Sequence, residues 1–321
     1  MSTEIRTIDI IIPTYRPGDL FLRLFAMLQK QTLPYQKLIV INTGEALMPQ
    51  TVREALLSDS RTILRDITEE EFDHAATRAF GVTLSDADAF VCMTDDAVPA
   101  DTLLLEKLAG ALGEEGAALA YARQLPAANA DEAERYVRRF NYPDTGRTKR
   151  IEDLEELGIK TFFASNVCCA YRREIYEQLG GFAGSAIFNE DMVYASAALR
   201  AGYCSVYCAE ARVVHSHNYT AMQQFHRNFD LGMSQQMHPE VFGGLKSEGE
   251  GIRLVKNTAG HLAASGAAAQ IPLFLVRTAF RYAGFRAGKA YEKLPDRLVM
   301  SFAMNKRGAK KILEERRKEQ T

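Results

Sequence analysis

A wholly apolar stretch, Ala89–Met93, is followed closely by two neighbouring carboxylates, Asp95 and Asp96. A run without polar alternation is typical of a strand buried on both faces, as in the middle of a parallel sheet. Open α/β sheets bind ligands at the carboxyl ends of such strands. Two adjacent acids repel each other, so we expect a cation beside them, and a divalent ion suits carboxylate ligands. The alternative is a helix cap made by one of these aspartates.

The first half of the chain alternates apolar runs with segments of helical spacing. Strands are expected at residues 8–15, 37–41, 61–65, 89–93 and 117–122, and helices at 20–31, 102–112 and the second half of 69–84. Strand, helix and strand at this spacing form parallel βαβ units. The sequence therefore predicts an α/β fold with a doubly wound, mostly parallel sheet of the Rossmann type.

The second half is less regular. Residues 127–158 are polar and predict an insert or a flexible loop. Beyond it we expect helices at 172–179 and 193–201, short strands at 204–208 and 211–215, and mainly helix from 221 onward. We therefore divide the chain into a domain of residues 1–235 and a helical C-terminal extension of residues 236–321.

The C-terminal segment is strongly basic. Residues 252–321 hold 15 Lys/Arg against 5 Asp/Glu, whereas residues 1–251 hold 24 against 36. Basic side chains interleave with aromatic ones between residues 274 and 293, which suits a helical cover over the sheet, a peripheral membrane helix or a nucleic-acid surface. We favour the first two interpretations and expect no nucleic-acid partner.

Other features point to the cytoplasm. The N-terminus carries no basic-then-apolar signal, and the longest apolar block of the C-terminal segment, residues 271–276, is far shorter than a membrane span. Five cysteines form no even framework, which fits a reducing compartment. We predict a cytoplasmic protein, with the basic extension as the part that could meet the inner face of the membrane.

Residues 8–230 resemble the family-2 glycosyltransferases of the GT-A fold, because several motifs occur in that family's order. The matching segments are Ile11-Ile12-Pro13-Thr14-Tyr15 for the opening strand and nucleotide loop, Met93-Thr94-Asp95-Asp96 for the Asp-x-Asp-type metal motif, and Asn189-Glu190-Asp191 for the Glu-Asp motif that contains the catalytic base. Within the family, the chain is similar to rhamnosyltransferases that use dTDP-L-rhamnose. That similarity lies in Glu71-Phe72-Asp73-His74, Thr77-Arg78, residues 215–219 and residues 223–225.

Two segments depart from the family pattern. Asn42-Thr43-Gly44 stands where aspartates often hold the nucleotide base, and Ala75-Ala76 stands where related rhamnosyltransferases usually have glycines. The first departure leaves the choice between dTDP-rhamnose and a UDP-sugar open. The second departure places two methyl groups, those of Ala75 and Ala76, where the donor is expected to approach.

The resemblance implies an inverting glycosyltransferase. It would move a sugar, L-rhamnose by the resemblance, from its nucleotide to a glycan or lipid-linked acceptor in cell-surface polysaccharide synthesis. The alternative is a non-catalytic nucleotide-sugar-binding or assembly protein on the same fold, which the two departures would suit.

The resemblance also implies roles for individual residues. Asp191 would be the catalytic base, and Asp96 would bind Mg²⁺ or Mn²⁺ with His215 or His217. Asp95 would contact the ribose or a metal-bound water, Arg78 a phosphate and Glu190 the acceptor hydroxyls. The full set of predicted substrate-binding residues is Thr14, Tyr15, Arg16, Asn42, Asp73, His74, Arg78, Asp95, Asn166 and Glu190. The alternatives are helix caps for Asp73 and Asp191, a surface salt bridge for Arg78, and hydrogen-bonded loop residues for Asn166 and each histidine.

Overall fold

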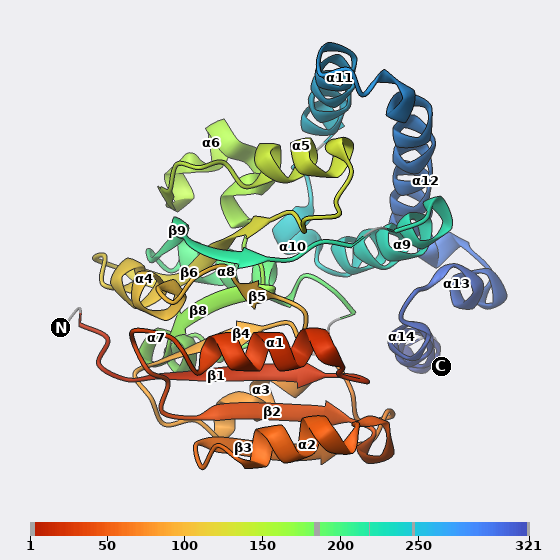
Figure 1. Ribbon diagram of the computed structural model, residues 1–321. Coiled ribbons are helices and arrows are strands. Elements are labelled where there is room, and N and C mark those ends of the chain that lie inside the picture. Colours follow the sequence, from red (N-terminus) through yellow and green to blue (C-terminus); the bar gives the residue numbers. More distant parts are fainter. Residues whose placement is uncertain (1–3, 183–186, 218, 246–247, 320–321) are drawn as a thin grey trace.

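A single mixed sheet forms the centre of the molecule. The computed structural model describes residues 4–182, 187–217, 219–245 and 248–319 (Figure 1). Its strands are β1 (Ile8–Thr14), β2 (Leu38–Thr43), β3 (Thr62–Ile67), β4 (Ala89–Met93), β5 (Val98–Pro99), β6 (Ala117–Leu125), β7 (Arg147–Lys149), β8 (Cys168–Arg172) and β9 (Cys204–Val214). They run in the order β3-β2-β1-β4-β8-β6-β9-β5, with β7 paired to β9. The β3-β2-β1-β4 and β6-β9 pairs are parallel, whereas β8, β5 and β7 pair antiparallel.

Helices cover both faces of this sheet, as the apolar runs predict. One face carries α1 (Asp19–Leu28), α2 (Gln50–Leu57) and α4 (Leu104–Leu112), and the other carries α3 (His74–Thr83), α7 (Arg173–Gln178) and α8 (Glu190–Arg200). In β1, Ile10 and Ile12 enter the first core and Ile11 enters the second. A strand whose alternate side chains are buried on opposite faces needs no polar positions.

Of the two alternatives for residues 127–158, an insert or a flexible loop, the flexible loop is wrong. This segment contains α5 (Glu132–Asn141), strand β7 and α6 (Leu154–Leu157). Asp131 caps α5 by accepting a hydrogen bond from the Glu134 amide at 2.8 Å. The helix buries Ala133 and Val137 in a small core shared with the C-terminal helices. The apolar face of α5 is narrow, so the polar composition of the segment gave no sign of a helix.

Two element boundaries also differ from the prediction. The two short strands expected at residues 204–215 are one strand, β9, whose register against β6 shifts between Ala122 and Arg123. The polar residues near Glu210 lie in this irregular part and interrupt the apolar pattern without ending the strand. Helix α8 begins at Glu190 rather than at Val193, so Glu190 and Asp191 lie in its first turn.

The C-terminal helices continue from the end of β9, and Figure 1 shows them beside the sheet. They are α9 (Ala221–Met237), α10 (Pro239–Phe242), α11 (Glu248–Ala264), α12 (Ile271–Lys289), α13 (Asp296–Phe302) and α14 (Lys306–Glu319). Among the described residues, none of the helices combines the length and apolarity needed to cross a membrane.

Helices α9 and α12 approach each other so closely that glycine is required between them. A Cβ atom at Gly284 would lie 2.2 Å from the Phe225 carbonyl oxygen, and one at Gly288 would lie 2.1 Å from that of Phe229. Both obstacles are backbone atoms, which cannot rotate away. This contact fixes α12 against α9 and therefore against the end of β9.

We expect Gly288→Ala to lower the free energy of unfolding by about 1–3 kcal/mol, the usual cost of overpacking. Gly260→Ala in α11 is the matched control, because no atom lies within 4 Å of its added Cβ. Alanine there is expected to be neutral or to stabilise by up to about 1 kcal/mol through helix propensity. Thermal and denaturant unfolding of both variants measure the difference, and equal stabilities would show that the helices can separate without cost.

Candidate active site

The predicted aspartates after β4 lie at the carboxyl edge of the sheet. Asp95 accepts a hydrogen bond from the Tyr15 amide, which follows β1, at 3.3 Å. Burial, together with the neighbouring charge of Asp96, raises the pKa of Asp95 to about 6. The two carboxylates therefore lie where adjacent parallel strands end, as the sequence predicts.

Asp96 lies against both candidate histidines, which follow β9. Its two carboxylate oxygens are 3.4 Å from His215 Nε2 and 3.1 Å from His217 Nε2. The two Nε2 atoms are 3.0 Å apart, and a ligand atom from each of the three residues lies within 4.8 Å of the others. Burial alone would raise the pKa of Asp96, but contact with the histidines holds it well below its usual range. Burial, followed by proximity to His215, lowers the pKa of His217 to about 4.

Gln124, at the end of β6, orients the His215 ring. The His215 Nδ1 atom lies 3.1 Å from Gln124 Oε1, and the Arg138 guanidinium donates to the same oxygen. An amide oxygen only accepts, so Nδ1 carries a proton, and Nε2, which faces Asp96, is the ring nitrogen that can bind a metal ion. Such outer contacts commonly fix the tautomer of a metal-binding histidine. One carboxylate and two imidazole nitrogens thus form a donor set that can hold a divalent ion.

The predicted nucleotide-binding residues lie at the ends of β1 and β2. The Thr14 hydroxyl donates to Asn42 Oδ1 at 3.3 Å, and Asn42 Nδ2 donates to Asp66 Oδ1 at 2.6 Å. Asp66 is the second-last residue of β3 and pairs in register with Asn42. The carboxylate that β2 lacks thus has a counterpart on the next strand, where Asp66 also pairs with Arg53 at 3.1 Å. The sequence analysis did not identify Asp66, although the parallel register would have placed it beside Asn42.

Tyr15 and Arg16 form the exposed rim next to Asp95. Arg16 adopts a left-handed backbone conformation with φ of 53°, and its guanidinium carbon lies 5.1 Å from the centre of the Tyr15 ring. The Tyr15 hydroxyl donates to Glu69 at 3.0 Å, and Glu69 is also paired with Arg307 of α14. The C-terminal helix therefore reaches the nucleotide-side rim. Contacts of Tyr15 and Arg16 with a nucleotide remain predictions.

Asp73 and His74 begin α3. Asp73 Oδ1 accepts from the amides of Ala75 and Ala76 at 2.9 Å each, so the cap that we gave as an alternative is present. The His74 ring packs edge-on against Phe72, with 5.1 Å between centroids. Burial lowers the pKa of His74 despite the opposing charge of Glu190. Their predicted contacts with the donor are compatible with these roles.

Arg78 and Glu190 form a buried pair rather than a surface salt bridge. The Arg78 guanidinium lies 3.0 Å from Glu190, and the two side chains are only 6% and 7% exposed. Asn166 Nδ2 donates to Glu190 at 3.0 Å and the Tyr171 hydroxyl donates to Asn166 Oδ1 at 2.7 Å. Burial alone would raise the pKa of Glu190, but the charges of Arg78 and His74 lower it. The carboxylate is therefore ionised and fixed.

Asp191 has the opposite electrostatic environment. Burial and the neighbouring charge of Glu190 raise its pKa to about 7. Its oxygens accept from the amides of Asn166 and Met192, at 2.8 Å each. The alternative that Asp191 is the helix cap is wrong, because the N-cap position is Asn189, with φ of 65°. Two adjacent carboxylates with separated pKa values are a common arrangement for acid–base chemistry.

The two halves of the site share one edge of the sheet. Arg78 acts electrostatically on both Asp95 and Asp191. The Thr94 amide donates to the Val167 carbonyl at 3.2 Å, which ties the loop after β4 to the loop before β8. Gln124 Nε2 donates to Ser165, the residue before Asn166, at 3.0 Å. Asp96 and Asp191 are thus joined through a short chain of contacts. Asn218, part of the motif at residues 215–219, lies outside the described residues.

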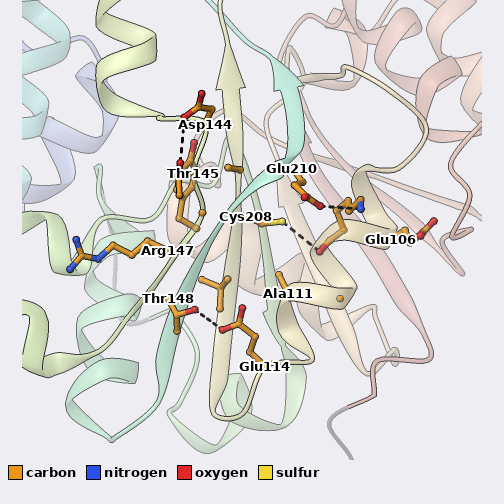
Figure 2. Close-up of a pocket in the computed structure, with 15 residues that line it drawn as sticks. Glu106, Ala111, Glu114, Asp144, Thr145, Arg147, Thr148, Cys208 and Glu210 are labelled. Carbon is orange, nitrogen blue, oxygen red and sulfur yellow. Dashed lines mark hydrogen bonds and ion pairs between the residues drawn. The ribbon is translucent and has the colours of Figure 1, made fainter.

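A separate hollow of about 830 Å³ opens between α4, β7 and β9 (Figure 2). Glu210 pairs with Lys107 at 3.0 Å, and Thr148 donates to Glu114 at 2.5 Å. None of the predicted site residues is among those that line it. We therefore assign the chemistry to the edge beside Asp96 and Asp191.

Comparison with known proteins identifies the family to which this chain is similar. The family model described as Glycosyl transferase family 2 matches residues 9–180. The O-antigen chain rhamnosyltransferase RfbN of Salmonella typhimurium is 38% identical over 304 residues, which cover 93% of this chain and 95% of that protein. The O-antigen chain rhamnosyltransferase WbaN of Salmonella anatum is 35% identical over 302 residues, covering 92% and 94%.

The fold has a counterpart among solved structures. The mannosyltransferase PcManGT from Pyrobaculum calidifontis, solved with GDP-Man and Mn²⁺, superposes with a TM-score of 0.58. The match covers 91% of this chain and 88% of that protein at 15% sequence identity. At this identity the likeness concerns the fold alone, and it confirms the predicted α/β class of GT-A type.

Proposed function

Because this chain belongs to glycosyl transferase family 2, we propose that it transfers L-rhamnose from dTDP-L-rhamnose, with inversion, to a glycan or lipid-linked acceptor. The rhamnosyl donor and a role in cell-surface polysaccharide synthesis are supported by the names and the 38% and 35% identities of its two O-antigen relatives. The observation that carries the proposal is the position of Asp191, a carboxylate of raised pKa, on the same sheet edge as Asp96 and its histidines.

Asp96, His215 and His217 are the residues that would hold the metal ion. Mg²⁺ prefers oxygen ligands, and two imidazoles in the set favour Mn²⁺ between the two ions that the sequence predicts. When bound, such an ion neutralises negative charge on the leaving diphosphate. Gln124 contributes by holding His215 in the tautomer with a free Nε2.

Asp191 is proposed to remove the proton from the acceptor hydroxyl as that oxygen attacks the sugar from the face opposite the nucleotide. Glu190 cannot share this role as readily, because Arg78 and Asn166 hold it as a fixed anion. We assign Glu190 and Arg78 as positioning residues: the Glu190 charge keeps the pKa of Asp191 high, and a more basic carboxylate accepts a proton more strongly.

The raised pKa of Asp191 predicts the pH dependence of transfer. Below its pKa of about 7 the base is protonated, so kcat/KM is expected to rise up to tenfold per pH unit and to level off above pH 7. The free energy of unfolding changes in the opposite direction and falls as the pH rises, because a carboxyl whose pKa is raised by folding destabilises the folded state when it ionises.

Glu190→Gln removes one cause of the raised Asp191 pKa and is expected to move the acidic limb of the pH profile to lower pH. If the acidic limb of the kcat/KM profile stays at the same pH in this variant, a group other than Asp191 causes it.

A donor screen tests the proposed function. Thermal shifts are measured with dTDP-, UDP- and GDP-sugars, with and without Mn²⁺, because a ligand that binds the native state raises its melting temperature. Sugars that bind are then offered with glycan and lipid-linked acceptors. A dTDP-L-rhamnose shift that depends on Mn²⁺, followed by transfer, supports the proposal. Binding without transfer to any acceptor would favour the alternative of a non-catalytic nucleotide-sugar-binding protein.

The basic extension of residues 236–321 is proposed to bring the enzyme to its acceptor at the inner face of the membrane. Leu273, Val276 and Phe280 of α12 are 52%, 47% and 36% exposed. Their spacing places them along one side of the helix, and basic residues elsewhere in the extension suit anionic lipid. Co-sedimentation with anionic and neutral vesicles tests this cytoplasmic, peripheral placement.

A further inference from the structure

The insert at residues 127–158, which the proposed function does not use, helps to form a pocket of about 370 Å³. This volume lies in the range of small-molecule binding sites. Phe140 of α5 and Lys149 of β7 line the pocket from the insert. Tyr121 of β6 and Tyr207 of β9 line it from the central sheet. We call it the insert pocket.

The lining of the insert pocket is mainly aromatic. Its rings are those of Tyr121, Phe140, Phe163 and Tyr207. The Tyr121 and Tyr207 rings stack, with 5.2 Å between centroids and 30° between planes. The Phe163 ring meets Tyr121 edge-on at 5.8 Å. None of the described residues that line the pocket is acidic. The lining therefore suits a ligand that has an apolar face.

The cationic groups that line the insert pocket already have partners. Lys149 is 4% exposed, and its ammonium donates to the carbonyl oxygens of Lys160, at 3.1 Å, and Phe163. Burial lowers the pKa of Lys149 to about 7. The Lys160 ammonium lies 4.9 Å from the centre of an aromatic ring, and Arg147 pairs with two acids at 3.0 Å and 3.1 Å. These groups are engaged and would also repel a cation, so an uncharged ligand fits the pocket better than an ion.

One polar group of the lining has no partner. The Tyr121 side chain is 5% exposed, and its hydroxyl forms no hydrogen bond with any residue that the structure describes. Buried hydroxyl groups are normally hydrogen-bonded. Asn141 and Thr145, which are exposed, add an amide and a second hydroxyl to the lining. The pocket thus offers neutral hydrogen-bonding groups beside its aromatic rings.

The insert pocket lies near the Asp191 side of the active site. Phe163 comes three residues before Asn166, whose amide donates to Asp191 at 2.8 Å. The Tyr142 ring lies 5.8 Å from the Phe163 ring, and its hydroxyl accepts from Gln124 at 2.6 Å. In the sheet, β4 and β8 separate β1 from β6 and β9. The pocket is therefore distinct from the predicted nucleotide contacts at the ends of β1 and β2.

We propose that the insert pocket binds a sugar unit of a glycan, at a carbohydrate site separate from the site of transfer. A sugar ring has an apolar face of C–H groups that packs on aromatic side chains, and its hydroxyls are uncharged hydrogen-bonding groups. Both properties match the rings and the unpaired Tyr121 hydroxyl. The source of the sugar rests on the proposed transferase function, because a glycan acceptor that reaches Asp191 would extend its earlier units past this side of the site.

Saturation-transfer nuclear magnetic resonance with methyl glycosides of rhamnose, mannose, galactose and glucose tests the site without turnover. Thymidine is the planar aromatic comparison, and dTDP with Mn²⁺ keeps the nucleotide site filled. We expect at least one glycoside to bind. Tyr121→Phe removes only the hydroxyl and is expected to weaken that binding about threefold to tenfold, the effect of losing one hydrogen bond. Phe140→Ala removes one aromatic ring and is expected to weaken it at least about tenfold.

Phe80→Ala in α3 is the control, because Phe80 is 40% exposed and does not line the pocket. This variant should bind the glycosides as the wild-type protein does. Three results would overturn the assignment: no glycoside binding, equal glycoside affinity in Tyr121→Phe, Phe140→Ala and the wild-type protein, or a thymidine signal that Phe140→Ala removes. Tyr121→Phe should keep the wild-type melting temperature within a few degrees, so a loss of binding in this variant cannot come from unfolding.

Transfer kinetics identify the source of the sugar, with an acceptor from the donor screen used whole and shortened to its terminal sugar. If the acceptor supplies the bound unit, Tyr121→Phe raises KM for the whole acceptor and leaves kcat and the KM of the shortened one unchanged. An unchanged KM beside weakened glycoside binding would overturn the acceptor as the source. Glycoside binding without transfer from any donor would refute the proposed function and keep this site, whereas transfer without glycoside binding would refute this site alone.

Discussion

Asp191→Asn is expected to lower kcat by about a thousandfold while dTDP-L-rhamnose still binds. An asparagine side chain cannot accept the acceptor proton at neutral pH, and general-base catalysis commonly contributes factors of about 10² to 10⁴. Donor binding should persist because the predicted nucleotide contacts, at Thr14 and Asn42, lie at the ends of β1 and β2. Donor affinity by calorimetry and single-turnover transfer rates separate the two effects.

The same substitution at Asp230 provides a matched control. Asp230 is also a buried carboxylate that accepts two backbone hydrogen bonds, from Met304 and Asn305 at 3.1 Å and 2.7 Å. Burial raises its pKa to about 6. It connects α9 to the loop before α14, so Asp230→Asn is expected to change stability and leave kcat within about threefold. Turnover by Asp191→Asn comparable to that of Asp230→Asn would contradict the assignment of the base.

The Asp191 variant should also remain folded. Asparagine loses one of the two hydrogen bonds that the carboxylate accepts from backbone amides, which costs about 1 kcal/mol. It also removes a buried charge whose ionisation is unfavourable, as the raised pKa shows. Because these effects oppose each other, we expect a melting temperature at pH 8 within a few degrees of the wild-type value.

Asp96→Ala is expected to abolish metal-dependent transfer, with a loss of at least about a hundredfold. A metal ion that stabilises developing charge contributes several kcal/mol, and each 1.4 kcal/mol is a factor of ten in rate. Asp96 supplies the single carboxylate of the triad, so the two imidazoles alone should hold Mn²⁺ much more weakly. The electron paramagnetic resonance signal of free Mn²⁺, titrated in the presence of dTDP, reports this loss independently of catalysis.

Asp101→Asn is the control for the metal experiment. Asp101 lies five residues further along the chain, pairs with Arg212 at 2.6 Å and accepts from the Leu103 amide at 2.9 Å. It takes no part in the triad. Mn²⁺ affinity should therefore be unchanged in this variant. Full-rate transfer by the wild-type protein in EDTA would contradict a need for the metal ion. Normal Mn²⁺ binding by Asp96→Ala would contradict the assignment of Asp96 as a metal ligand.

The sequence was sufficient for the parts of the site that follow a regular strand. Asp95 and Asp96 are placed by an apolar run whose composition suits a parallel strand, and their position was predicted with that strand. The family resemblance then assigned Asp191 to the site, where its carboxylate accepts from the Asn166 amide, and its role as the base stays a prediction. These residues could be predicted from the sequence because strand ends and short motifs are local features.

Partners that depend on distant packing were not predictable in the same way. Gln124 orients His215 only because β6 and β9 run side by side, and Asp66 reaches Asn42 only through strand register. Helix α12 lies against α9 only because Gly284 and Gly288 allow the two backbones to approach closely. A polar sequence also hid α5, since a helix that buries only a few residues has a weak apolar pattern.

The central claim is that Asp191 assists an inverting transfer of L-rhamnose beside the triad formed by Asp96, His215 and His217. The anomeric configuration of the product, determined by nuclear magnetic resonance after transfer from dTDP-L-rhamnose, tests it most directly. We predict a rhamnosyl linkage opposite in configuration to the donor, formed by the wild-type protein and lost in Asp191→Asn. A product that retains the donor configuration would contradict a single displacement assisted by this base.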